Sequence, residues 1–296
     1  IAGCCAGDAS GQRLIERGQV TNPLWDQRDP VPAGAWRGLH TLGGWFVFGP
    51  YLAGDDDHAW HHEIGGFLEL VRTARTSLLV TTQIEFIADP HNEINFNPRA
   101  VFWEEGLVLT RRLSGFDLQL GYYHRCKHDV DNLELGTERS LVYGSLRGRA
   151  IVPLSEARPH DAYAAVSADL YTLVWEGREP SAFEGLGTDW GRLLGAADAT
   201  VHVRRPLAGP GVGVYVTAFG GLNAYGARDG FFDRFAGLRR VYPHGGVSAG
   251  FSLRGRATLR LGLEYEYLPD TGIPVVPRDA HLVRLVIRAM SPFAVQ

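Results

Sequence analysis

Apolar and polar residues alternate along most of the chain from about residue 41 onward. In the segment 257–268, Leu259, Leu261 and Leu263 share one face, while Arg260 and Glu264 share the other. Side chains of an extended strand point alternately to its two faces, so this pattern predicts a strand with one apolar and one charged side. We predict twelve such strands, at residues 41–51, 60–72, 77–88, 98–112, 115–127, 139–152, 162–176, 191–205, 211–224, 241–254, 257–268 and 280–293.

The links between the predicted strands alternate between short and long. Tight links follow even-numbered strands, as at 73–76 and 113–114, and longer polar links follow most odd-numbered ones, as at 128–138 and 177–190. The link 153–161, after the sixth strand, is somewhat longer than the other even-numbered ones. Barrels that cross the bacterial outer membrane have short periplasmic turns and long outer loops. A soluble β-sandwich, the alternative fold, gives no reason for this segregation.

The alternation and the link lengths over residues 41–296 resemble those of bacterial outer-membrane β-barrels of about twelve strands. The resemblance implies an all-β, closed antiparallel transmembrane barrel with porin-like architecture in the outer membrane of a Gram-negative cell. Residues 1–40 show no clear periodicity and are expected to form an irregular N-terminal segment, on the periplasmic side or folded into the barrel. The last strand departs from the family pattern, because Phe293 is followed by Ala294, Val295 and Gln296.

Composition changes this interpretation little. The chain is 45% hydrophobic and 21% charged, and it has no run of about eighteen apolar residues, so membrane-spanning helices are not expected. A net charge of −4 without a basic cluster argues against nucleic acid as a partner. Three cysteines cannot form a complete set of disulfides. The first residues, Ile1 to Cys4, resemble a lipobox, which makes lipidation of Cys4 an alternative.

The polar faces of the strands place many charges inside the predicted barrel. Buried charges must pair or remain hydrated, so we expect an interior packed by ion pairs and water. A narrow selective pore is the alternative. The interior charges predicted by the alternation are Glu69, Glu85, Asp117, Arg147, Arg149, Asp169, Asp198, Arg204, Arg260, Glu264, Glu266, Arg284 and Arg288.

The densest ionisable residues lie at the predicted outer end. Imidazole and carboxylate groups are usual ligands of divalent metals. A solvated loop is the expected structure here, and a divalent-cation site at the outer rim is the alternative. The candidate ligands are His58, His61, His62, His128 and Asp129.

A second candidate site combines His124 and Cys126 with Glu138. The arrangement resembles the His-x-Ser motif of outer-membrane phospholipases and lipid A deacylases, which place an amide or carboxylate on the next strand. The resemblance implies that Cys126 is a nucleophile, that His124 activates it and that Glu138 orients the imidazole, on the lipid-facing wall. Cysteine in place of serine, with Lys127 after it, departs from the motif.

The sequence therefore predicts an outer-membrane barrel with a structural, anchoring or narrow-pore role. The alternative is an acyl hydrolase that acts on lipid through His124, Cys126 and Glu138. Outer-membrane lipid, lipopolysaccharide and surface or periplasmic proteins are the expected partners. No cofactor is expected apart from a divalent cation at the outer rim.

Overall fold

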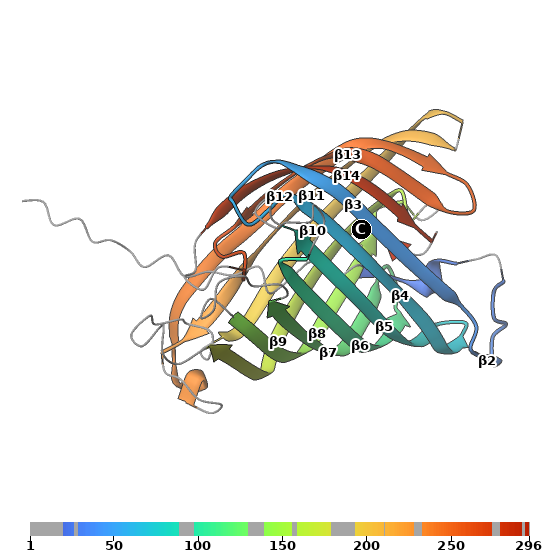
Figure 1. The fold of residues 1–296 in the computed structure, drawn as a ribbon. Coiled ribbons are helices and arrows are strands. Elements are labelled where there is room, and N and C mark those ends of the chain that lie inside the picture. The colour runs from blue at the N-terminus through green and yellow to red at the C-terminus, as the bar shows by residue number, and fades with distance from the viewer. Residues whose placement is uncertain are drawn as a thin grey trace, which may run out of the picture.

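The computed structural model describes residues 20–26, 29–88, 98–129, 139–155, 159–178, 193–209, 211–227, 233–273, 279–291 and 294–295. Within them, twelve antiparallel strands form one closed sheet (Figure 1). They are β3 (Leu42–Ala53), β4 (Trp60–Thr73), β5 (Thr76–Ala88), β6 (Ala100–Arg112), β7 (Asp117–Asp129), β8 (Arg139–Pro153), β9 (Ala162–Arg178), β10 (Leu193–Ala208), β11 (Val212–Gly226), β12 (Leu238–Arg254), β13 (Thr258–Leu268) and β14 (Ala280–Met290). The predicted barrel is confirmed.

Each barrel strand pairs with its neighbours in the chain, and the last strand pairs with the first. Arg284 and Arg288 of β14 lie opposite Tyr51 and Val47 of β3, which closes the sheet. Figure 1 shows this closure, with β3 in blue beside β14 in red. The tight links gather at one end of the barrel, called here the short-turn end, and the longer links gather at the long-link end.

The two faces of the strands have opposite chemistry. Leu261 and Leu263 on β13 are 41% and 53% exposed, whereas Arg260 and Glu264, which flank this pair in the sequence, are buried. The outer surface is therefore apolar, as the alternation predicted, and it suits the hydrocarbon of a bilayer. No helix within the described residues is long and apolar enough to cross a membrane.

The interior is packed with charged side chains. Of the predicted interior charges, Asp198 and Glu266 are half-buried and all the others are buried. Several form close pairs across neighbouring strands: Arg147 Nε lies 2.9 Å from Asp169 Oδ2, and Arg284 Nε lies 3.0 Å from Glu264 Oε1. The expected packing by ion pairs is therefore observed.

The two described ends of the chain meet inside the barrel. Strand β1 (Val20–Thr21) pairs antiparallel with β15 (Ala294–Val295), and the 3-10 turn η1 (Pro23–Trp25) follows β1. Strand β2 (Trp36–Gly38) pairs with Val71–Thr73 of β4 and thereby prolongs β3 at the short-turn end.

Candidate functional site

Residues 20–26, called here the inner seal, occupy the lumen at the short-turn end. Asp117 Oδ2, at the start of β7, accepts hydrogen bonds from Asn22 Nδ2 at 2.8 Å and from Trp25 Nε1 at 2.7 Å. Leu24 and Trp25 are only 1% and 4% exposed. One buried carboxylate of the wall thus holds two side chains of the inner seal.

Wall side chains also bind the backbone oxygens of the inner seal. Arg112 Nη2 donates to the Leu24 carbonyl at 2.6 Å, and Gln119 Nε2 donates to the Thr21 carbonyl at 2.7 Å. Arg72 Nη2 donates to the Asp26 carbonyl at 3.0 Å. A segment with a single 3-10 turn leaves most of its carbonyls without backbone partners in a helix, and these long polar side chains supply hydrogen-bond donors.

The indole of Trp25 packs against aromatic rings at the same end. Its ring centroid lies 5.7 Å from that of Tyr163 and 5.6 Å from that of His160, both edge-on. Burial, aided by the nearby guanidinium of Arg254, lowers the pKa of His160 to about 4. His160 is therefore neutral at neutral pH and adds no charge beside the indole.

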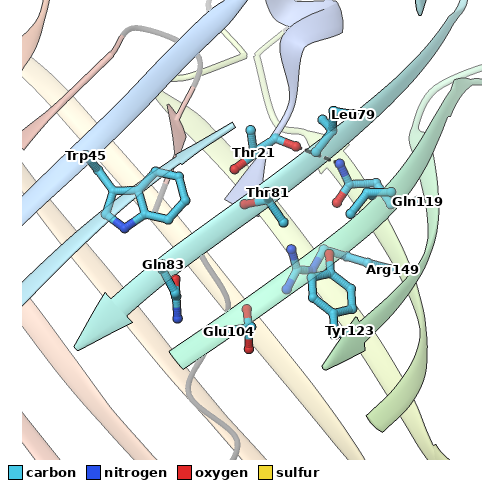
Figure 2. Close-up of a pocket in the computed structure, with 10 residues that line it drawn as sticks. Thr21, Trp45, Leu79, Thr81, Gln83, Glu104, Gln119, Tyr123 and Arg149 are labelled. Atoms are coloured by element: carbon cyan, nitrogen blue, oxygen red, sulfur yellow. Dashed lines mark hydrogen bonds between the residues drawn. The ribbon is translucent and has the colours of Figure 1, made fainter. Parts of the chain in front are cut away.

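A small cavity lies against the inner seal inside the barrel (Figure 2). Its volume is about 10 Å³, which is room for about one water molecule. Figure 2 shows the Gln119–Thr21 hydrogen bond at its edge. The residues that line it are Thr21, Trp45, Leu79, Thr81, Gln83, Glu104, Val108, Gln119, Tyr123 and Arg149.

Nearer the long-link end, a network centres on Glu85. Its Oε2 lies 3.1 Å from Arg125 Nη2, and its Oε1 lies 2.8 Å from His61 Nε2. Arg125 Nη1 is also 3.7 Å from Glu104 Oε2. These four side chains come from β4, β5, β6 and β7 and are buried, so they connect four neighbouring strands on the lumen side of the wall.

The link after β13 folds over the lumen at the long-link end, and residues 269–273 are called here the outer seal. Asp270, Thr271 and Ile273 are fully buried. Ile273 packs in one cluster with Ile87 of β5 and Phe102 of β6, strands well removed from β13 and β14 in the sheet. The outer seal therefore extends from one wall of the barrel to another.

The predicted metal ligands are dispersed over both faces of the wall. His61 points into the lumen and contacts Glu85, whereas its neighbour His62 packs outside against Phe48, with ring centroids 4.7 Å apart. His58 Nδ1 contacts Asp55, and His128 is exposed.

The side chain of Asp129 lies outside the described residues. Within the described part of the chain, no group of three or more His, Cys, Asp or Glu side chains could hold a metal ion. A metal site that includes Asp129 stays a prediction.

The predicted catalytic residues are only partly described. His124 and Cys126 are half-buried on the outer face of β7, the face on which the motif requires them. Glu138 lies outside the described residues, so the predicted triad is not tested. Glu105 of β6 lies directly opposite His124 in the sheet and is exposed on the same outer face.

The sequence analysis did not single out Glu105, although a signal was present. Glu104 and Glu105 are consecutive within one strand. In a period-two strand, one of two consecutive residues faces the lumen and the other faces lipid. Glu104 is buried inside the barrel, so the carboxylate of Glu105 lies on the lipid-facing side.

A groove lies beside Glu105 on the outer face of β3 to β7, and it is called here the lipid-facing groove. Its volume is about 620 Å³, and its lining is almost entirely apolar. Gly66, Leu68, Val80 and Leu107 line it, and Glu105 and His124 lie at its margin. The lipid-facing groove is thus far larger than the cavity of about 10 Å³ beside the inner seal.

No protein-family model and no curated protein matches this sequence. Solved structures that resemble the fold include LpxR from Salmonella typhimurium, with 9% identity, a TM-score of 0.41, and coverage of 84% of this chain and 99% of that one. The translocator domain of the autotransporter NalP from Neisseria meningitidis has 10% identity and a TM-score of 0.35, covering 83% and 86%. The outer membrane protein OprD from Pseudomonas aeruginosa has 10% identity and a TM-score of 0.28, covering 87% and 96%.

At these identities and TM-scores, the similarities carry no argument about this chain. The closure of β14 on β3, the apolar outer face and the charged interior are properties of this chain itself. They identify its described residues as a closed, twelve-strand antiparallel barrel of the kind found in bacterial outer membranes.

Proposed function

We propose that this protein is a non-conducting outer-membrane barrel with a structural or anchoring role. The observation that carries the proposal is the inner seal, which is buried in the lumen and tied to the wall through Asp117. A pore needs a continuous aqueous path, and a buried, hydrogen-bonded segment blocks that path at the short-turn end.

Three other features support the same role. The outer seal covers part of the lumen at the long-link end. Between the two seals, buried arginines pair with carboxylates from neighbouring strands. The cavity beside the inner seal has room for only about one water molecule. Such an interior stiffens the barrel and leaves its outer surface and long links as the parts that meet partners.

Conductance measurements test the proposal. Purified full-length protein, inserted into planar lipid bilayers, is expected to give no steady ohmic current steps, because the lumen is filled. Flotation of the protein with lipid vesicles verifies that insertion occurred. Large and steady steps from inserted protein would contradict the closed-lumen role and favour a pore.

A second candidate function is hydrolysis of a lipid ester. Its specific support is the position of His124 and Cys126 on the outer face of β7, beside the lipid-facing groove. In this reaction, His124 takes the thiol proton and the sulfur of Cys126 attacks the ester carbonyl. The alcohol leaves with a proton from the imidazole, and water then cleaves the thioester to release the fatty acid.

Release of fatty acid from phospholipid vesicles tests this second candidate. Cys126→Ala is expected to abolish release, whereas Cys126→Ser is expected to retain part of it, because serine is the nucleophile of the similar motif. Equal release by the wild type and by Cys126→Ala would rule out a role for the thiol. Absence of release by the wild type would leave the non-conducting role alone.

A further inference from the structure

We propose that the lipid-facing groove binds one membrane lipid whose head group carries an ammonium beside a phosphate. One acyl chain lies along the apolar floor of the groove, and the ammonium contacts Glu105. This inference goes beyond the closed-lumen role and is independent of any hydrolysis.

The register of the strands divides the groove into a polar row and an apolar row. Gly66, Thr82, Glu105 and His124 are consecutive cross-strand partners on β4, β5, β6 and β7. The next outward row toward the short-turn end consists of Leu68, Val80, Leu107 and Tyr122. The groove thus has a polar margin toward the long-link end and an apolar floor below it, the order found in a lipid.

The groove is hollow because two outward positions carry no side chain. Gly44 of β3 and Gly66 of β4 lie opposite each other, and both interrupt an outward series of large residues that includes Phe46 and Ile64. An added Cβ would lie 2.9 Å from the Gly65 carbonyl oxygen at Gly44 and 3.2 Å from the Gly43 carbonyl oxygen at Gly66. The same two glycines therefore let β3 and β4 approach closely and leave the outer surface open at this point.

Glu105 requires a partner on this surface. An ionised side chain on the lipid-facing wall is costly when it has no counter-charge. The indole Nε1 of Trp103, one outward position nearer the long-link end, donates to Glu105 Oε1 at 2.6 Å. This neutral donor orients the carboxylate but does not balance its charge.

The charge of Glu105 selects the head group. A carboxylate attracts an ammonium and repels an anionic head group, and both effects strengthen near hydrocarbon, where the dielectric constant is low. His124, directly opposite Glu105, adds a ring N–H donor beside it that suits a phosphate oxygen. A phosphoethanolamine head group offers both groups side by side.

Photo-crosslinking tests the site with the intact protein in phosphatidylglycerol bilayers, whose head groups carry no ammonium. The probe is a small fraction of phosphatidylethanolamine with a photoreactive acyl chain, and the same chain on phosphatidylglycerol is the comparison. We expect the phosphatidylethanolamine probe to label peptides of β4, β5 and β6 at least about 10-fold more than those of β10 and β11, which corresponds to about 1.4 kcal/mol. Uniform labelling around the barrel would overturn the proposal.

Two substitutions separate the apolar and the polar parts of the site. Val80→Trp fills the groove and is expected to reduce labelling of β4 to β6 to the level of the other strands. Val201→Trp is the matched control, because Val201 is also an exposed valine of the outer face, on β10. Glu105→Gln is expected to keep the labelling while removing the preference for phosphatidylethanolamine over phosphatidylglycerol.

Each opposite result contradicts the proposal. Equal loss with Val80→Trp and Val201→Trp would show that the groove is not the site. A preference for phosphatidylethanolamine that survives Glu105→Gln would show that the carboxylate does not select the head group. Cys126→Ala is expected to leave labelling unchanged, so failure of the hydrolase candidate or of the closed-lumen role does not affect this test.

Discussion

Glu264→Gln is expected to lower the free energy of unfolding by about 3–5 kcal/mol, the usual cost of breaking a buried ion pair. Glu264 is 1% exposed, and its two carboxylate oxygens contact Arg284 and Arg288. Glutamine keeps the shape of the side chain but leaves two buried guanidinium groups without this counter-charge. Arg260, directly opposite Arg288 in the sheet, adds like-charge repulsion. Urea unfolding in lipid vesicles, followed by tryptophan fluorescence, measures the change.

Glu266→Gln is the matched control for this prediction. Glu266 lies on the same strand as Glu264 and also faces inward, two residues nearer the long-link end, but it is only half-buried. Its substitution is expected to cost less than about 1 kcal/mol, because solvent screens the interactions of a partly exposed charge. Similar losses for both variants would mean that the buried pairs do not dominate the stability of the lumen.

The second large effect concerns the attachment of the inner seal. Asp117→Ala removes the shared acceptor of Asn22, Trp25 and Arg112. Buried donors left without an acceptor cost about 1–3 kcal/mol each and do not add fully, so we expect docking of the seal to weaken by about 2–4 kcal/mol. This corresponds to an increase of about 30- to 1,000-fold in the population of the undocked state.

Labelling of a cysteine in the seal by a water-soluble maleimide measures this population. Leu24→Cys serves as the reporter, because Leu24 is buried when the seal is docked. Cys4, Cys5 and Cys126 are replaced by serine so that only the reporter can react. Asp29→Ala is the control: it breaks only the exposed contact of Asp29 with Arg37, just beyond the seal. An unchanged labelling rate in Asp117→Ala would show that the carboxylate does not hold the seal in place.

The barrel strands could be predicted because the apolar–polar alternation that defines each strand lies within a short stretch of sequence. Every one of the predicted strands is present, and most begin and end within three residues of the expected positions. Strand β12 begins at Leu238 rather than at the predicted residue 241, because the consecutive charges of Arg239 and Arg240 interrupt the apolar–polar alternation. Each strand carries its own two-residue pattern, and a wrong register would place Arg260 or Glu264 in lipid.

The two seals and the lipid-facing groove could not be predicted in the same way. Residues 20–26 and 269–273 have no periodicity, and their positions depend on partners far away in the chain, such as Asp117 and Phe102. The groove depends on which strands are adjacent, because Gly66, Glu105 and His124 come together only through the register of four strands. The outward position of His124 and Cys126 on β7 could be predicted, since the alternation of side chains along a strand is a local property.

The pairing of β1 with β15 links the inner seal to a segment that follows the last barrel strand, β14. The paired strands β1 and β15 are separated by nearly the whole sequence, so their contact closes the longest loop in the molecule and carries a correspondingly large entropic cost. Contacts of this separation form late, after the barrel strands have paired with their neighbours. Until β15 docks, the inner seal lacks this pairing and is held by its hydrogen bonds to Asp117, Arg112 and Gln119. The pairing of β1 with β15 is therefore expected to form after the barrel closes, and an exposed Trp25 would mark a barrel in which the inner seal has not yet docked.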